Sequence, residues 1–323
     1  MKAAVSEKYG PPDILRVENA EKPVPKENEV LIKVFATTVN RTDCAILRGK
    51  PLFFRLFTGV IKPNRPIQGT DFAGEIASAG KNATKFKEGD RVFGFDDLGL
   101  SSHAQYLILS ENNAIASIPD LITYEQAAAS IEGGHYALNF LNKLDIKEGQ
   151  KVLVNGATGA IGSAAVQLLN YYGAKVTAVC QKKDEDLVKS IGATTVIDYI
   201  TEDFTSSGEK YKYVFDAVGK SSFSRCKPIL ENDGAYISSE LGWMAQNLFL
   251  PLLTSVSGSK KVIFPLPRDR AESVRLIKKL LAEGRFLPLI DRKYPLEEIA
   301  DAYRYVEKGQ KTGNVIITVD HSH

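Results

Sequence analysis

The stretch Lys151-Val-Leu-Val-Asn-Gly-Ala-Thr-Gly-Ala-Ile-Gly162 decides the fold of this chain, and it continues without a break into residues 163–173. An apolar, β-branched run leads into small residues and then into a helix-forming segment, so the stretch predicts a strand, a glycine-rich turn and a helix. Small residues let such a turn approach phosphate oxygens, and the helix that follows offers unpaired N–H groups and a positive dipole end. We therefore expect a dinucleotide pyrophosphate to bind at this turn.

The spacing of the turn is Ala157-x-Gly159-x-x-Gly162, with alanine in the first glycine position and Gly156 just before it. Such a triplet is weak evidence alone, but a second strand, Lys175–Cys180, completes a βαβ unit at the expected length. The alternative is a turn that needs small residues only for packing. The predicted cofactor-binding residues of this turn are Gly156, Ala157, Thr158, Gly159, Ala160 and Ile161.

Length and composition are those of a globular protein: 323 residues allow two domains, with 44% hydrophobic and 25% charged residues. The net charge of +2 and the lack of a long basic run argue against nucleic acid or an anionic membrane as the main partner. A net charge near zero still allows local basic pockets. No apolar run is long enough to span a bilayer and no signal peptide is evident, so we expect a cytoplasmic enzyme. The three cysteines are widely spaced and predict neither a disulfide framework nor a metal site.

The order of predicted elements indicates two modules. Short strands at 1–5, 29–37, 72–79, 90–95 and 104–109 predict a β-rich, barrel-like module. A helix at 124–140 follows, and then strands alternate with helices as in a doubly wound parallel sheet, at 152–155, 176–179, 195–197, 213–217 and 235–238. The tail predicts helices at 271–283 and 297–308, a turn at Tyr294-Pro295 and a closing strand at 314–319. If that strand returns to the first module, the module is discontinuous.

Several motifs occur in the order of one family: Val39-Asn40-Arg-Thr-Asp43, Gly69-Thr-Asp-Phe-Ala-Gly74, Phe86-Lys-Glu-Gly-Asp-Arg-Val92, the nucleotide motif and Phe215-Asp-Ala-Val-Gly219. Through them nearly the whole chain resembles the medium-chain dehydrogenase/reductase superfamily, in its zinc-free quinone oxidoreductase (zeta-crystallin-like) branch. The resemblance implies an α/β protein with a GroES-like β-rich catalytic domain at 1–122 and 290–323 and a Rossmann NADP(H)-binding domain at 123–289. It further implies a cleft active site, a homodimer formed through the Rossmann domains, and Val218 as a cofactor contact.

Zinc ligands of the alcohol dehydrogenase relatives are missing. Asn40 takes the place of the first cysteine, Gly69-Thr70-Asp71 replaces Gly-His-Glu, and the four-cysteine lobe expected near 90–105 is absent. His103 and His135 are isolated, and His321 and His323 lie at a terminus that we expect to be disordered. We expect no bound metal. Without a Lewis acid, a small apolar quinone or α,β-unsaturated carbonyl is an easier hydride acceptor than a plain ketone.

The end of the second Rossmann strand predicts NADPH as the cofactor. It reads Gln181-Lys182-Lys183, with no acid to bind a ribose 2′-hydroxyl and two ammonium groups to neutralise a 2′-phosphate, helped by the Gln181 amide. Tyr199 matches a tyrosine that relatives bring to the adenosine phosphate. Alternatively, the lysines cap a surface turn and pair with the acids at 184–186.

Three residues are candidates for catalysis: Asn40, Asp43 and Tyr136. By resemblance, Asn40 and Asp43 face the nicotinamide, where the amide can donate to a carbonyl or a ribose hydroxyl and the carboxylate can orient water or relay a proton. As an alternative, both residues only hold a turn. Tyr136 takes the position of a threonine in relatives, and its phenol, or His135, is a candidate proton donor. Glu132 and His135 either contribute titratable groups to the site, or they face outward or pair with each other.

Two apolar segments suggest a hydrophobic acceptor. Phe53, Phe54 and Phe57 are predicted to form a lid over the substrate, with core packing or a dimer contact as alternatives, and residues 243–253 line the same cleft or a subunit interface. The leading hypothesis is an NADPH-dependent quinone or enone reductase. A zinc-free alcohol or aldehyde dehydrogenase and a low-turnover NADPH-binding sensor or structural protein are the alternatives.

Overall fold

The computed structural model describes residues 1–52, 55–238, 246–257, 259–264 and 269–322. Within it the chain divides into two compact units, Met1–Glu132 with Asp269–His323, and Gly133–Arg268. Phe53, Phe54 and residues 243–245, which belong to the two apolar segments that we connected with a hydrophobic acceptor, lie outside the described residues.

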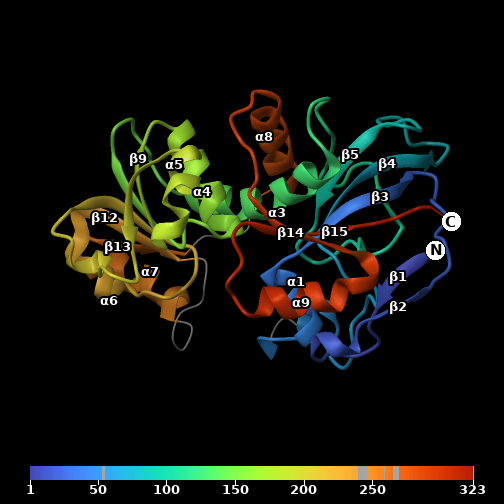
Figure 1. Cartoon of the computed structure of the whole chain (residues 1–323), viewed down its shortest axis with the longest axis horizontal. Helices are drawn as coiled ribbons and strands as arrows, with labels where there is room; N and C mark the ends of the chain where they lie inside the picture. The colour runs from blue at the N-terminus through green and yellow to red at the C-terminus, as the bar shows by residue number, and fades with distance from the viewer. Residues whose placement is uncertain (53–54, 239–245, 258, 265–268, 323) are drawn as a thin grey trace. The chain divides into compact units, whose positions relative to one another are not determined.

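The second unit is a doubly wound sheet, as predicted. Its six strands are all parallel and run in the order β10-β9-β8-β11-β12-β13, and Figure 1 shows α4 and α5 on one face and α6 and α7 on the other. Helices on both faces bury the central strands, which explains the continuous apolar run in β8. The elements are β8 (Lys151–Asn155), α4 (Ala160–Tyr171), β9 (Lys175–Cys180), α5 (Glu185–Ser190), β10 (Ala193–Asp198), β11 (Tyr211–Asp216), α6 (Phe223–Cys226), β12 (Leu230–Ser238), α7 (Gln246–Ser257) and β13 (Lys261–Ile263).

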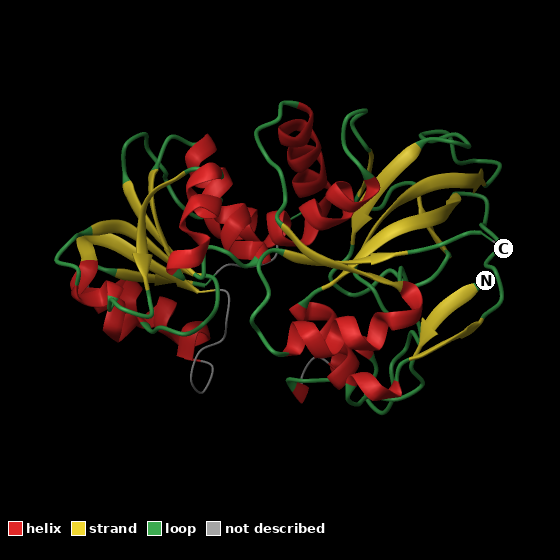
Figure 2. Cartoon of the chain, viewed as in Figure 1, coloured by secondary structure: helices red, strands yellow, loops and turns green. Residues whose placement is uncertain are grey.

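The first unit is the expected β-rich module. Its main sheet has the order β14-β15-β3-β4-β5-β7, with β6 paired to β3, and β1 and β2 form a separate hairpin. Figure 2 shows these strands and the helices packed beside them, among which α1 and α9 contact each other. The elements are β1 (Lys2–Val5), β2 (Arg16–Asn19), β3 (Glu29–Val39), α1 (Arg41–Arg48), α2 (Arg55–Thr58), β4 (Asp71–Ala79), β5 (Arg91–Phe95), β6 (Tyr106–Ser110), β7 (Ile115–Ser117), α8 (Arg270–Ala282), β14 (Ile290–Pro295), α9 (Ile299–Glu307) and β15 (Asn314–Thr318).

The closing strand returns to the N-terminal module, so this unit is discontinuous in sequence. β15 pairs antiparallel with β3, with Val315 opposite Val39. The turn that we expected at Tyr294-Pro295 is wrong, because both residues belong to β14 and pair with β15. β14 is the edge strand, where a proline that ends the strand breaks no ladder.

Two helices divide between the units in ways that the sequence did not indicate: one helix spans the boundary at residues 132–133, and a later one belongs to the first unit. α3 (Tyr124–Leu141) begins against the first unit, where Tyr124 stacks on Phe35 with 4.7 Å between ring centroids, and ends in the second, where Phe140 packs on Phe215 at 4.9 Å. α8 lies in the first unit rather than with the nucleotide-binding module to which we assigned residues 123–289. Lys278 of α8 donates to the Ser117 hydroxyl of β7 at 2.6 Å.

None of the helices in the described part of the chain is long and apolar enough to cross a membrane. Cys44, Cys180 and Cys226 are buried free thiols, in agreement with the expectation from their spacing.

Candidate functional site

The predicted phosphate turn lies at the carboxyl end of β8, the strand at which the sheet order reverses. Gly156 has a φ of +78°, and a Cβ there would lie 2.3 Å from Val218 Cγ1. A Cβ on Gly162 would lie 2.1 Å from the Gly156 carbonyl oxygen, so these two glycines are required by packing alone. Gly159 is different: its φ is −69°, and the nearest atom to an added Cβ would be 3.6 Å away. Its small size therefore keeps space open at the turn.

The N-terminus of α4 is free to receive an anion. Gly159 is the N-cap residue, and no side chain in the described ranges caps the helix there. The first amides of a helix lack intrahelical partners and point along the positive end of its dipole. A phosphate that enters the space beside Gly159 would meet these amides.

Asp216, to which we assigned no role, organises the neighbouring turn after β11. It is fully buried, and its carboxylate accepts hydrogen bonds from the backbone N–H groups of Gly219 at 3.0 Å and Ser221 at 2.9 Å, from Asn155 Nδ2 at 3.0 Å and from the Tyr236 hydroxyl at 3.0 Å. These bonds hold the turn that carries Val218 against Gly156. The signal in the sequence was an acid at the end of an apolar strand, directly before a small-residue turn.

The end of β9 brings together the residues predicted to bind the 2′-phosphate. Gln181 Nε2 donates to the Tyr199 hydroxyl at 2.7 Å, and the tyrosine is half exposed. Lys182 forms an ion pair with Glu185, as the alternative interpretation expected. Hydrogen bonds from Lys182 and Lys189 lower the pKa of Glu185 to about 2. Lys183 is exposed and has no ion pair with any residue that the structure describes, so it is the lysine available to an anion.

In the first unit, Asn40 and Asp43 form the start of α1. Asn40 is the N-cap, and its backbone N–H donates to Asp43 Oδ2 at 2.8 Å in a capping box. Both residues are buried. Their capping box holds the turn at the start of α1, which is the role that the alternative interpretation gave them. Asp43 Oδ1 is also buried and has no hydrogen-bond partner within the described residues.

Asp71 and His103 are structural groups. Asp71 accepts from the Thr38 backbone N–H at 2.8 Å and from the Thr37 hydroxyl at 3.2 Å. His103 Nε2 lies 2.9 Å from the Thr38 carbonyl oxygen and must donate to it, which leaves Nδ1 to accept from the Tyr303 hydroxyl at 3.3 Å. Burial lowers the pKa of His103 to about 4, so the ring is neutral and serves as a bridge between β3 and α9.

Three buried carboxyl groups in the first unit carry raised pKa values. Burial and then the charge of Asp71 raise the pKa of Asp43 to about 8, and burial raises that of Asp71 to about 6. Burial and the charges of Asp43 and Asp71 raise the pKa of Glu132. Lys311 is the cation that opposes this effect on Glu132, and burial lowers its own pKa to about 8. The cluster therefore holds at least one proton at neutral pH.

This proton predicts a pH-dependent stability. A carboxyl whose folded pKa lies above its unfolded value stabilises the fold at low pH and loses that contribution as the pH rises toward the folded pKa. Between pH 5.5 and 7.5 the ionisation of Asp43 should lower the free energy of unfolding of the wild type by up to about 1.4 kcal/mol per pH unit, which is seen as a fall in Tm. Asp43→Asn should make this fall less steep. The window lies below the pKa of about 8 of Lys311. The upper half of the window, above pH 6.5, also lies above the range from 6.5 down to about 4 in which neutral His103 destabilises the acidified fold, so the slope there is the one to compare.

The measurement is a calorimetric Tm series for the wild type, Asp43→Asn and the control Asp186→Asn, whose carboxyl is exposed. Equal slopes for wild type and Asp43→Asn would show that Asp43 ionises normally.

The three candidate residues on helix α3 differ in how far their side chains are exposed. Glu132 and His135 are buried, so the expectation that they face outward is wrong. Asn139 Nδ2 donates to His135 Nε2 at 3.0 Å, so this ring nitrogen is the acceptor and carries no proton. Tyr136 is half-buried and lies edge-on to His135, with 5.5 Å between ring centroids. Of the three, Tyr136 is the side chain with surface to offer a ligand.

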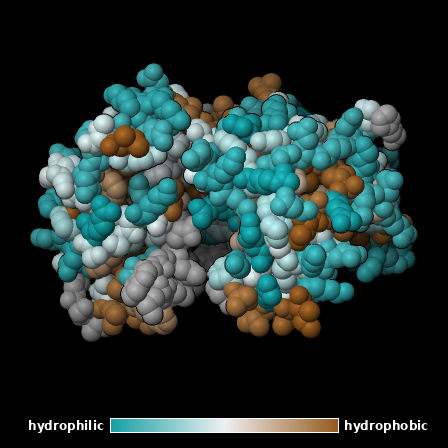
Figure 3. Space-filling view, turned by 60° about the horizontal axis from the view of Figure 1, so that its bottom comes forward, coloured by the Kyte–Doolittle hydropathy of each residue, from teal (hydrophilic) through white to brown (hydrophobic). Residues whose placement is uncertain are grey.

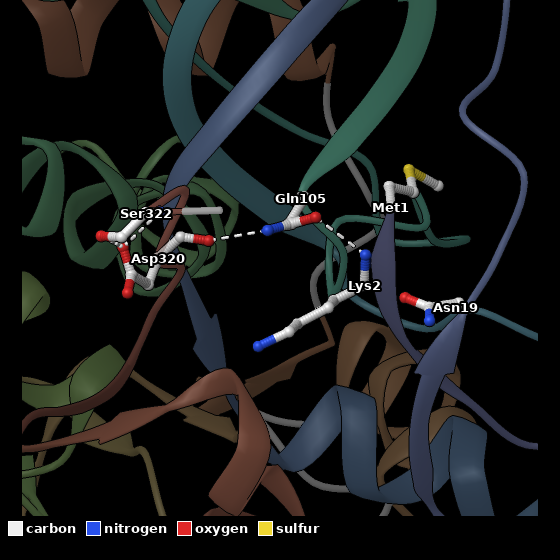
Figure 4. Close-up of a pocket in the computed structure, with 6 residues that line it drawn as sticks. All are labelled: Met1, Lys2, Asn19, Gln105, Asp320 and Ser322. Atoms are coloured by element: carbon white, nitrogen blue, oxygen red, sulfur yellow. Dashed lines mark hydrogen bonds between the residues drawn. The ribbon is translucent and has the colours of Figure 1, made fainter.

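A cavity of about 210 Å³ in the first unit lies apart from these candidates. Figure 4 shows its lining, in which Gln105 Nε2 donates to the Asp320 carbonyl oxygen at 2.8 Å and Gln105 Oε1 accepts from the Lys2 backbone N–H at 2.8 Å. These bonds join the two ends of the chain. The terminus that we expected to be disordered is also held at His321, whose Nε2 donates to the Val34 carbonyl oxygen at 2.7 Å. No candidate site residue lines this cavity.

Comparisons with known proteins cover nearly the whole chain. Residues 26–120 match the family described as alcohol dehydrogenase GroES-like domain, and residues 191–317 match the family described as zinc-binding dehydrogenase. The chain is 33% identical to the chloroplastic quinone-oxidoreductase homolog of Spinacia oleracea, over 95% of each chain. It is 30% identical to the chloroplastic NADPH-dependent alkenal/one oxidoreductase of Arabidopsis thaliana, over 98% of this chain and 79% of the relative.

A solved structure shows the same fold from end to end. The quinone oxidoreductase from Coxiella burnetii superposes with a TM-score of 0.87 at 26% identity, over 99% of both chains. The match, with that of residues 26–120, confirms a GroES-like domain combined with a parallel-sheet, Rossmann-like domain.

Proposed function

Because this chain belongs to the quinone-oxidoreductase-like branch of the medium-chain dehydrogenase/reductase superfamily, and is by that membership an oxidoreductase with a nicotinamide cofactor, we propose that it is a zinc-independent, NADPH-dependent reductase of quinones or α,β-unsaturated carbonyls. The observation that carries the proposal is the open space beside Gly159 at the N-terminus of α4, with Lys183 unpaired at the end of the neighbouring strand. A dinucleotide that carries a 2′-phosphate fits both features.

The residues of the turn would hold the cofactor through its phosphates. The backbone of Gly156, Ala157, Thr158 and Gly159 and the first residues of α4, Ala160 and Ile161, would surround the pyrophosphate, with Val218 beside it. Gln181, Lys183 and Tyr199 would bind the 2′-phosphate, and Lys182 would contribute less because Glu185 already neutralises it. When bound, the cofactor supplies a hydride.

The chain's own residues then have to manage one negative charge and one proton. Hydride addition to the β-carbon of an enone moves an electron pair to the carbonyl oxygen, and the resulting enolate takes a proton at the α-carbon. We propose that the Tyr136 hydroxyl hydrogen-bonds or protonates this enolate. Asn40 would donate to the carbonyl or to a ribose hydroxyl, and Asp43, whose pKa of about 8 keeps it protonated near neutrality, would relay the proton.

Zinc does not fit the residues at the position of the metal in the alcohol dehydrogenase relatives. Asn40 donates its amide to the Thr38 hydroxyl, Thr70 offers only a hydroxyl, and the Asp71 carboxylate is occupied by Thr37 and Thr38. An amide nitrogen, a hydroxyl and a hydrogen-bonded carboxylate are not the thiolate and imidazole donors of a tetrahedral zinc site. Within the described ranges, no group of three His, Cys, Asp or Glu residues could hold a metal ion.

We therefore expect the purified, tag-free protein to contain well under one zinc per chain and to keep its activity after treatment with a chelator. Elemental analysis by inductively coupled plasma mass spectrometry, before and after chelation, is the measurement. One zinc per chain whose removal abolishes turnover would contradict the zinc-independent mechanism.

The proposed activity is tested by following nicotinamide absorbance with a panel of quinones, enones, aldehydes and alcohols, each with NADPH and with NADH. Oxidation of NADPH by quinones or enones, and none by saturated aldehydes, is the expected result. Turnover of alcohols would favour a zinc-free alcohol dehydrogenase, and tight NADPH binding without turnover would favour a sensor. The homodimer and the cytoplasmic location stay predictions, and some of the relatives are named as chloroplastic.

A further inference from the structure

A surface segment of the first unit has an unusual composition. Residues 44–70 contain five basic residues and no Asp or Glu, although the whole chain has 39 acidic residues in 323 and a net charge of only +2. Four of these cations, Lys50, Arg55, Lys62 and Arg65, lie in residues 50–65, and we call the described residues of this stretch, 50–52 and 55–65, the docking segment. The near-neutral charge of the whole chain, from which we argued against an anionic membrane as the main partner, therefore hides a local positive charge.

The docking segment also exposes large apolar side chains. Leu52 is 68% exposed, Leu56 73%, Phe57 63%, Val60 66% and Ile61 89%. Figure 3 shows hydrophobic side chains gathered at the surface of this unit, on the face that carries α2. Apolar groups gathered in this way are typical of an interaction site. Core packing, one of the alternatives for Phe57, is excluded by its exposure.

The fold holds these side chains outward. Thr58, Gly59 and Pro63 are buried, and the Tyr9 hydroxyl donates to the Gly59 carbonyl oxygen at 2.6 Å. The Asn64 backbone N–H donates to the Thr58 carbonyl oxygen at 2.7 Å, which closes the loop on itself. Gly59 has a φ of +123°, and a Cβ there would lie 2.0 Å from a backbone oxygen of the same loop. The polar backbone therefore points inward, and the apolar side chains between the anchors point to solvent.

Arg55 belongs to the anchor rather than to the free surface. Its guanidinium stacks on the Tyr9 ring at 4.5 Å and its Nε donates to the Gly49 carbonyl oxygen at 3.1 Å. Lys50 and Lys62, in contrast, are exposed and form no ion pair with the residues that the structure describes. Two free ammonium groups thus flank the exposed apolar side chains.

We propose that the docking segment binds the surface of an anionic lipid bilayer, with Leu56, Val60 and Ile61 entering the headgroup region and Lys50 and Lys62 at the lipid phosphates. Apolar insertion and attraction of basic residues to anionic lipids act together in such binding. A second copy of the chain is a poorer occupant, because a two-fold contact would set this positive segment against itself. The inference does not depend on the proposed reaction.

The test is co-sedimentation of the full chain with extruded vesicles of phosphatidylcholine alone or with 30% phosphatidylglycerol, at low and high salt. Binding should require phosphatidylglycerol and weaken at high salt. Leu56→Ser with Ile61→Ser should reduce the partition coefficient by about tenfold, and Lys50→Glu with Lys62→Glu by a similar factor. The controls are Leu121→Ser and Lys26→Glu, which change exposed side chains outside the segment and should leave binding unchanged.

Each outcome decides the inference. Because the four changed side chains of the segment are exposed, the variants should keep the wild-type Tm. Failure of the wild type to bind the anionic vesicles, or equal loss in the controls, would overturn the proposal. Light scattering on the same proteins gives the remaining outcome: if Leu56→Ser with Ile61→Ser converts a dimer to a monomer, the segment is a contact between copies and not a lipid-binding surface.

Discussion

Replacing Tyr136 with phenylalanine should lower kcat for an enone by about 100-fold or more, which is the usual scale of general acid catalysis, and leave NADPH affinity nearly unchanged. The substitution removes one hydroxyl and keeps the ring, which lies edge-on to His135 and is half-buried. A quinone should be affected less, because a hydroquinone anion is a much weaker base than an enolate and can take its proton from solvent. The ratio of the two losses is therefore the diagnostic quantity.

Tyr124→Phe is the matched control, because it removes a phenol from the same helix 12 residues away, or about 18 Å along the axis. The Tyr124 hydroxyl donates to Glu75 and has a structural partner, so its loss should affect stability and not the enone-to-quinone ratio. Steady-state kinetics with both acceptors, together with a Kd for NADPH, are the measurements. An unchanged enone turnover in Tyr136→Phe would assign this residue to packing and leave Asn40, Asp43 and water to manage the charge and the proton.

Reversing the charge of Lys183 is expected to weaken NADPH binding by about tenfold or more, because a charge-assisted phosphate contact contributes on the order of 1.5 to 3 kcal/mol. NADH lacks the 2′-phosphate, so its affinity should change little. Lys183 is chosen over Lys182 because Glu185 already pairs with the latter. Lys175→Glu, the same reversal at the opposite end of β9, is the control.

Fluorescence titrations with NADPH and with NADH measure the two dissociation constants of the wild type and of each variant. A loss of NADPH affinity confined to Lys183→Glu would support recognition of the 2′-phosphate. Equal losses for NADPH and NADH would show instead that the lysine acts on the nucleotide as a whole, and the preference for NADPH would then need another source.

Local signals in the sequence were sufficient for most of the fold. The strand, turn and helix of 151–173 follow from β-branched residues, obligatory glycines and a periodic helix, all of which act over short distances. The α/β alternation after Lys151 and the helices α8 and α9 were predictable for the same reason. Tyr294-Pro295 was not, because a proline has the same sequence signature in a turn and at the end of an edge strand.

The candidate site also has a part that local sequence predicts and a part that depends on tertiary contacts. The composition of the phosphate turn and of Gln181-Lys182-Lys183 is a property of contiguous residues, and the sequence by itself determined both. The sequence could not distinguish Lys182 from Lys183, since that depends on which of them Glu185 reaches. It also could not identify Asp216 as the residue that supports the turn of Val218, since its partners Asn155 and Tyr236 lie on other strands.

Long-range burial decided the rest. Asp43 and Glu132 are 89 positions apart in sequence, yet in the tertiary structure the charge of Asp43 adds to burial in raising the pKa of Glu132. Burial of a carboxyl group and the distance between two charges exist only once the chain has folded, because both depend on which elements pack together. The sequence therefore determined the family, the two modules and the nucleotide turn. Only the tertiary structure decided which charges are paired, which protons are held and which apolar side chains face solvent.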